Sequence, residues 1–288
     1  APKDRNGTSS MVQVIIGAAL LVVPVYFLLS QSDVLGVLLI VMMLALVAYF
    51  IWSGIQSGSK EQLHRYIAML ILFAANILFW ALFEQAGSSL NFLARDFVDM
   101  PTIFGYEVHF TIFQSVNPVF IILLAPVFAA MWPALDRSNI NPSIPRKFGY
   151  GLIGAAVGFY VLVFAIEHSV GANGKISWMW LTLTYLIHTM GELCLSPIGL
   201  AMVTKLARPQ ETGLAMGGWF LSIAMANFVA GRIAAIATAG GGGGHGEAAG
   251  SLVQYADVFW QLFQLGIVIA AVYFLCAPLI NRLMHGVK

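Results

Sequence analysis

The chain has 288 residues, of which 59% are hydrophobic and only 9% are charged, and its formal net charge is +1. Soluble domains are about 45–50% apolar and about 25% charged, so this composition excludes a water-facing surface and predicts a membrane protein. No basic face accumulates, so we expect no nucleic-acid partner. Cys194 and Cys276 lie within apolar runs, which indicates small buried side chains and carries no information on the redox compartment.

Eight apolar runs follow one another along the chain, separated by glycine, proline and charged residues. A membrane helix needs about 20 mostly apolar residues to cross about 30 Å of hydrocarbon, and these runs have that length. They lack the alternation of a membrane β-barrel, so we expect an all-α membrane protein. The expected spans are 11–30, 34–53, 67–90, 110–132, 148–167, 178–203, 214–237 and 258–280.

The spans and the polar stretches between them divide the chain into four parts. A polar linker, 1–10, precedes an accessory transmembrane hairpin, 11–53, whose two spans contain no charged side chain. A second polar linker, 54–63, leads to a six-helix bundle, 64–288. Within this bundle we expect the glycine-rich stretch 239–250 to form a flexible surface loop.

Lysine and arginine are distributed unequally between the two sides that these spans define. If both termini are cytoplasmic, eleven of the 14 lysines and arginines lie on that side; Arg95 and Lys175 lie on the other, and Arg232 falls within a span. Cytoplasmic loops carry such an excess of positive charge. We therefore expect a multi-pass protein of the cell inner membrane with both termini cytoplasmic.

Few charged or histidine side chains lie within the spans, not counting the last residue of each span. They are Glu84, His188, Glu192 and Arg232. A charge near the centre of a membrane helix costs about 2.5–3.5 kcal/mol even on the gentler insertion scale, so such groups normally face a cavity or a partner. For Arg232, near the outer end of its span, we expect a structural ion pair or a snorkelling side chain.

Glu84 is the first candidate for function. Trp80, Glu84 and Ser88 follow one another at four-residue intervals, so we expect them on one face of the helix 67–90. If that helix continues, Asp96 lies about 18 Å beyond Glu84, near the outer rim of the bilayer. Burial disfavours a charged carboxylate and a nearby cation favours it, so Glu84 can bind and release a proton as its partners change. The alternative is a glutamate in a permanent ion pair between helices.

Glu192 is the second candidate, in the sixth expected span. His188, Glu192 and Ser196 again share one helical face, and Pro197 leaves the carbonyl of Leu193 without its helical donor. A kink beside a carboxylate near the midplane is typical of transporter sites. The alternative is a proline bend that shapes packing only. For His188 we expect a hydrogen-bond partner rather than a proton relay.

Two further spans contain polar or aromatic candidates. Asn117, in the span 110–132, suits an amine or amide substrate, and it suits pairing with a neighbouring helix equally well. Trp219, in the seventh span, is a candidate wall of a cavity. The glycine pairs Gly154–Gly158 and Gly213–Gly217 indicate close helix packing.

The motifs of enzymes and metal sites are missing from the sequence. It has no HExxH, GxSxG, P-loop or CxxC motif, and its histidines lack ligand spacing. The GxGxxG match at Gly149–Gly154 follows no strand and opens a membrane helix, so it does not indicate a dinucleotide site. We therefore expect no enzyme, no metal and no organic cofactor.

Three segments in the bundle resemble the proton-dependent oligopeptide transporter family, a branch of the major facilitator superfamily. They are FWALFEQAGSSL at 79–90, QSVNPVFIILLAP at 114–126 and GELCLSPIGLAMVTKLA at 191–207. The resemblance covers about 60–285 in the order of the family's helices seven to twelve. The hairpin 11–53 resembles the two extra helices that bacterial members insert between their halves.

The resemblance implies roles in proton coupling and gating. Trp80 and Glu84 match the tryptophan and the acid of the family's seventh helix, and that acid is tied to coupling, with the proton as the coupling ion. Asp96 is similar in position to an acid that pairs with a first-helix arginine to close the outer gate.

The resemblance also implies a binding site for a peptide. Asn117 matches an eighth-helix asparagine near the peptide's amino terminus, and Glu192 matches the tenth-helix glutamate that binds that ammonium. Ser196 lies one turn on, and Trp219 is similar to an eleventh-helix tryptophan of the cavity.

This sequence departs from the family in lacking the ExxERFxYY signature of the first half, together with the arginine and lysine expected to hold the peptide carboxylate. The expected partners are therefore a di- or tripeptide substrate, the missing N-terminal six-helix half and the lipid bilayer.

The function expected from these observations is proton-coupled symport of di- and tripeptides. Two alternatives remain open: a facilitator-fold transporter of another small solute, and a non-transporting membrane scaffold subunit.

Overall fold

The computed structural model describes residues 7–238 and 251–287. The glycine-rich stretch 239–250 and residues 1–6 of the expected linker lie outside the described residues. The chain forms two compact units, Ala1–Ala45 and Leu46–Lys288. Since this boundary falls inside a helix, the finer division into linkers, hairpin and bundle stays a prediction.

The first unit contains α1 (Gly7–Ser30) and most of α2 (Ser32–Gln56), which are joined at Gln31. Large apolar side chains of both helices are exposed, among them Leu20, Tyr26 and Val37. Such a surface suits contact with lipid, as expected for the segment 11–53.

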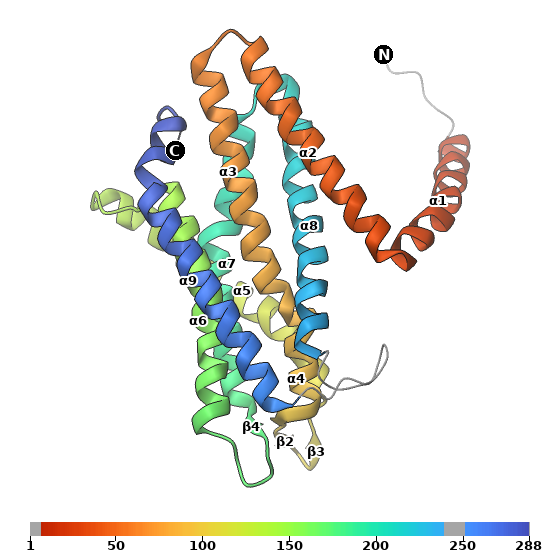
Figure 1. Ribbon diagram of the computed structural model, residues 1–288, viewed down its shortest axis with the longest axis vertical. Helices are drawn as coiled ribbons and strands as arrows, with labels where there is room; N and C mark the ends of the chain where they lie inside the picture. Colours follow the sequence, from red (N-terminus) through yellow and green to blue (C-terminus); the bar gives the residue numbers. More distant parts are fainter. Residues whose placement is uncertain (1–6, 239–250, 288) are drawn as a thin grey trace. The chain divides into compact units, whose positions relative to one another are not determined.

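The second unit is a bundle of long helices, which Figure 1 shows in chain order. Its helices are α3 (Lys60–Phe83), α4 (Ser89–Phe97), α5 (Phe113–Arg137), α6 (Ile144–His168), α7 (Trp178–Leu206), α8 (Thr212–Thr238) and α9 (Leu252–Leu283), with short 3₁₀ turns η1 (Glu84–Gly87), η2 (Phe110–Ile112) and η3 (Pro209–Glu211). Serines begin several of them: Ser59, Ser177 and Ser251 accept backbone N–H groups of the first turn, as N-cap residues do.

The structure confirms an all-helical membrane protein. Among the described residues, seven helical segments are long and apolar enough to cross a membrane. The first expected span, 11–30, corresponds to α1, whose apolar stretch Met11–Phe27 is shorter than the others.

Four two-residue strands at one end of the bundle were not predicted. β1 (Val98–Asp99) pairs in parallel with β4 (Ile176–Ser177), and β2 (Thr102–Ile103) pairs antiparallel with β3 (Tyr106–Glu107). They connect the segments that follow α4 and precede α7, and we call this end the strand end of the bundle.

Helix α6 packs most extensively against α9 and α7, and α3 packs along α8. A Cβ on Gly154 would lie 2.9 Å from Cα of Gly191 in α7, so these helices approach as closely as glycine allows. This confirms the packing predicted for the first glycine pair. A Cβ on Gly213 or Gly217 would meet nothing within 4 Å, so in the described part of the chain the second pair makes no such contact.

A charged network joins the last part of α2 to the bundle at the end opposite the strands. Glu211 is 7% exposed and accepts hydrogen bonds from the hydroxyls of Tyr49, Ser53 and Tyr66. Arg208 donates to both of its carboxylate oxygens, at 3.0 Å from Nε and 2.9 Å from Nη2. These hydrogen bonds raise the pKa of the Arg208 guanidinium above its ordinary value, so Arg208 stays charged.

Candidate functional site

The helix that carries Glu84 is broken at that residue. α3 ends at Phe83, the turn η1 follows, and Ser88 has φ −129° and ψ −97°, which no helix allows. A second helix, α4, then leads to Asp96. The condition for the stated distance from Glu84 to Asp96, a helix that continues unbroken, is therefore not met, because the backbone changes direction one turn beyond Glu84.

Gln85, next to Glu84, holds this broken turn to the neighbouring helix. Its side chain is fully buried; Nε2 donates to the carbonyls of Ala81 and of Ala230 in α8, and its Oε1 accepts from Ser89. An interrupted membrane helix requires such replacement partners for its backbone groups. The turn is thus a defined structure rather than a frayed end.

Glu84 and Glu192 lie in one electrostatic neighbourhood. Both side chains are half-buried, and they lie near enough for the two carboxylates to interact electrostatically. Glu84 also interacts with the side chain of Asn227 in α8. Two carboxylates that repel each other disfavour a state in which both are charged. Proton binding at one of them therefore depends on the charge of the other.

Asn117 joins Glu192 across the interface of α5 and α7. Its Nδ2 donates to Oε2 of Glu192 at 2.9 Å and to the hydroxyl of Thr189 at 3.0 Å. The structure therefore brings together the amide and the carboxylate that sequence analysis singled out. Their remaining acceptors, Oδ1 of Asn117 and the second oxygen of Glu192, suit an ammonium group.

The aromatic and hydroxyl candidates take different positions. Ser196 is half-buried one turn beyond Glu192 in α7. Trp219 is only 2% exposed and packs against Phe73, at a ring-centroid distance of 6.3 Å. A Cβ on Gly199 would lie 2.1 Å from its ring, so glycine is what admits the indole. Trp219 is thus part of the packed interior of the bundle in this conformation.

Trp80 and Asp96 lie on either side of Glu84. The Trp80 ring contacts Phe83 edge-on at 5.2 Å, and its indole Nε1 is buried without a hydrogen-bond acceptor among the described residues. Asp96 forms a bidentate ion pair with Arg95, at 2.7 Å from Nε and 2.9 Å from Nη2. The acid expected at the gate, Asp96, is thus already paired with the adjacent Arg95.

His188 lies in the interior with its partner defined. It is 1% exposed, and its Nε2 donates to the carbonyl of Ala155 in α6 at 2.9 Å. The expectation of a hydrogen-bond partner agrees with this contact, although the partner is a backbone carbonyl.

The sequence alone assigned no role to Gln85, Thr189 or Asn227. Thr189 precedes Glu192 by three residues and so shares its helical face, a signal that was available. Gln85 and Asn227 act on backbone or side chains of other helices, and no spacing within their own segments indicates this.

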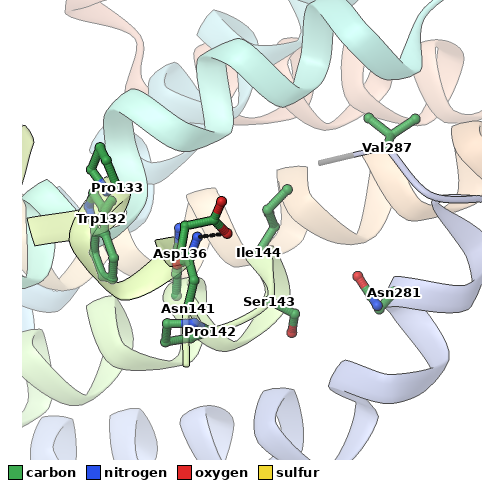
Figure 2. Close-up of a pocket in the computed structure, with 10 residues that line it drawn as sticks. Trp132, Pro133, Asp136, Asn141, Pro142, Ser143, Ile144, Asn281 and Val287 are labelled. Carbon is green, nitrogen blue, oxygen red and sulfur yellow. Dashed lines mark hydrogen bonds between the residues drawn. The ribbon is translucent and has the colours of Figure 1, made fainter. Parts of the chain in front are cut away.

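A pocket lined by α5 and α6 lies away from this site, and Figure 2 shows it. It has a volume of about 520 Å³ and lies where α5 meets α6, at the end of the bundle opposite the strands. Asn141 donates to Asp136 there at 3.2 Å, and the Lys147 ammonium lies 4.3 Å from the centroid of the Trp132 ring. Its ionisable groups are thus engaged with their own neighbours, so the site remains at Glu84 and Glu192.

Comparison with known proteins places this arrangement in a family. The model of the POT family matches residues 22–245. The chain is 35% identical over 294 residues to the peptide transporter YePEPT of Yersinia enterocolitica subsp. palearctica and 31% identical over 278 residues to dipeptide and tripeptide permease A of Edwardsiella piscicida. The alignments cover 99% and 96% of this chain, and 55% of each relative.

A solved structure gives the same result for the fold. A crystal structure of a variant of the peptide transporter POT in complex with alafosfalin matches 98% of this chain and 55% of that chain, with a TM-score of 0.76 and 30% sequence identity. The chain thus defines a multi-pass membrane protein of a transporter class rather than an enzyme. It belongs to the POT family, and it spans about half the length of the relatives that it matches.

Proposed function

We propose that this chain is the C-terminal half of a proton-coupled symporter that moves di- and tripeptides inward across the cytoplasmic membrane. The observation that carries the proposal is the hydrogen bond between Asn117 and Glu192, set within electrostatic reach of Glu84. A substrate acid and a proton-binding acid in one neighbourhood are what coupled transport requires.

In this proposal the peptide ammonium binds between Glu192 and Asn117. A carboxylate supplies the countercharge, and the amide oxygen adds a directed hydrogen bond. Ser196 lies one turn on and contributes to the same subsite. Trp80 borders it, and its indole N–H, which has no acceptor in the described part of the chain, is a donor for a peptide carbonyl.

Glu84 is the proposed proton-binding residue. A proton on Glu84 removes the repulsion between the two carboxylates. It also breaks the ion pair that Glu84 forms with a cation of the other half. Asp96 is the proposed gate residue, and to act there it must exchange Arg95 for an arginine of that half. Trp219 supports the site through its packing on α3 and α7.

The other half of the transporter supplies what this chain lacks. Helix α5 exposes large apolar side chains along its length, among them Val119, Ile122 and Val127, and they need a covering partner. We place the cations for the peptide carboxylate on that half. The excess of lysine and arginine in the loops supports cytoplasmic termini, with the strand end facing outward.

Uptake by the complete transporter, reconstituted in liposomes with an inward proton gradient, tests the proposal. We expect accumulation of a radiolabelled dipeptide that collapses when a protonophore is added, and competition by unlabelled dialanine. Accumulation of another small solute that dialanine does not inhibit would favour the alternative of a different substrate. Absence of any gradient-dependent transport would favour a scaffold subunit.

A further inference from the structure

The carbonyl oxygen of Ala86, in the turn η1, accepts hydrogen bonds from two other helices. Nε2 of Gln114 in α5 donates at 3.0 Å, and the hydroxyl of Tyr185 in α7 donates at 3.3 Å. A broken membrane helix exposes carbonyls that lack helical donors, and here side chains supply them. The turn that carries Glu84 is therefore held by the same two helices that hold Asn117 and Glu192.

Tyr185 is itself held firmly in position. It is 2% exposed, and its ring stacks on Phe113 of α5 with centroids 5.9 Å apart and planes 13° apart. Its backbone carbonyl accepts a hydrogen bond of 2.7 Å from the hydroxyl of Thr189. The position of the Tyr185 hydroxyl, and with it the hydrogen bond to Ala86, therefore depends on how α5 and α7 lie relative to each other.

A path of hydrogen bonds that passes through the residue Tyr185 leads from Glu192 to the turn η1, which carries Glu84. Asn117 donates to Glu192 and to Thr189, and Thr189 donates to Tyr185. Tyr185 donates to Ala86, two residues from Glu84. Asn117 donates to two acceptors, and Thr189 and Tyr185 donate to one each, so a shift at Glu192 changes the geometry at Ala86.

The physical consequence follows from competition for Glu192. An ammonium bound to Glu192 replaces or reorients the Asn117 donor, because both bind the same carboxylate. Movement of Asn117 shifts α5 against α7 and with it both donors to Ala86. Coupling between sites requires such an element with two arrangements, and the broken turn η1 provides it.

We propose that Gln114 and Tyr185 are positioning residues that couple occupancy of the peptide site to the position of Glu84. They touch neither the proposed substrate nor the proton and act only through the Ala86 carbonyl. The proposal rests on the proposed function, because it assigns the ammonium to Glu192 and the proton to Glu84.

Two transport modes of the complete transporter in liposomes separate coupling from binding. Exchange of labelled for unlabelled dipeptide without a gradient needs the peptide site, and accumulation against a concentration difference needs coupling to protons. For Gln114→Leu/Tyr185→Phe we expect exchange within about twofold of wild type and accumulation reduced at least about tenfold. The single variant Tyr185→Phe keeps the ring stack on Phe113, which preserves the fold, and it should show the same imbalance to a smaller extent.

A matched control removes the same groups elsewhere. The hydroxyl of Tyr273 donates to the carbonyl of Ile71 in α3, and Nε2 of Gln62 donates to the carbonyl of Leu206 at 3.0 Å. Gln62→Leu/Tyr273→Phe therefore deletes two hydrogen bonds to helix carbonyls away from the break. We expect wild-type proportions of exchange and accumulation in this variant.

The outcomes distinguish this inference from the proposed function. Accumulation at the wild-type level in both Gln114→Leu/Tyr185→Phe and Tyr185→Phe overturns the inference. A loss of exchange and accumulation in equal proportion also overturns it, because such a loss indicates damage to the fold. In either case a wild-type protein that transports dipeptides leaves the proposed function intact. A wild-type protein that performs neither mode contradicts the proposed function itself.

Discussion

Gly158 of α6 lies directly against the imidazole of His188 in α7. A Cβ at position 158 would stand 2.3 Å from both Cδ2 and Nε2 of His188, closer than any real contact. The His188 ring is enclosed by Phe83 and Phe159, at centroid distances of 6.0 and 5.1 Å, so it cannot move aside freely. This contact fixes the distance between α6 and α7 one helical turn before Glu192.

Gly158→Ala should therefore destabilise the protein by about 1–3 kcal/mol, the usual cost of overpacking a closed interior. Thermal unfolding of the purified transporter in detergent measures this as a lowered Tm. Gly231→Ala is the matched control, since a Cβ on Gly231 of α8 meets nothing within 4 Å, and its Tm should equal or exceed wild type. Equal Tm values for Gly158→Ala and wild type would show that His188 can rearrange.

The network around Glu211 makes a second prediction about stability. Arg208→Gln leaves the enclosed Glu211 carboxylate with hydroxyl donors only, which should cost about 1–3 kcal/mol. Arg208→Gln/Glu211→Gln removes both charges and should recover part of that loss. Thermal unfolding in detergent compares the Tm values of the two variants. A lower Tm for the double variant would show that the Glu211 carboxylate does not require the charge of Arg208.

Because the pKa of Arg208 is raised, its contribution persists at every pH below its unfolded value and is lost only as the pH rises through the folded value. The destabilisation by Arg208→Gln should consequently be the same at pH 6 and pH 9. A loss that disappears at pH 9 would assign the effect to another group.

Glu192→Gln tests the ammonium site. A hydrogen bond to a charged partner contributes about 1.5–3 kcal/mol, so the half-saturating dipeptide concentration in exchange should rise about 10- to 100-fold. Glu167→Gln is the matched control, since Glu167 is an exposed glutamate at the end of α6. An unchanged half-saturating concentration in Glu192→Gln would show that the peptide ammonium does not bind to Glu192.

The sequence contained enough information to place the spans and to choose Asn117 and Glu192. Each span is a local property of about 20 residues, and the paired polar residues stand out because the membrane makes them costly. Their contact could be expected from polarity, and the hydrogen bond of 2.9 Å between them agrees with it.

The break after Glu84 could not be predicted in the same way. The four-residue spacing from Trp80 to Ser88 is compatible with one helix, and the donors that stabilise the turn come from Gln114 and Tyr185, 28 and 99 residues from Ala86 along the chain. Such donors are invisible to helical periodicity.

Trp219 illustrates a second limit of sequence reasoning. A tryptophan among small residues fits a cavity wall and a packed interior equally well. Its burial depends on Gly199, on another helix. Its role in the site stays a prediction.

Glu84 is the residue that we propose binds the transported proton. Glu84→Gln retains the size of the side chain and its hydrogen-bonding capacity toward Asn227, and it removes only the titratable proton. In liposomes with an inward proton gradient, Glu84→Gln should lose accumulation of dipeptide by at least about tenfold and keep exchange without a gradient, while Glu167→Gln should keep both. Gradient-driven accumulation by Glu84→Gln at the wild-type level would contradict proton binding at Glu84.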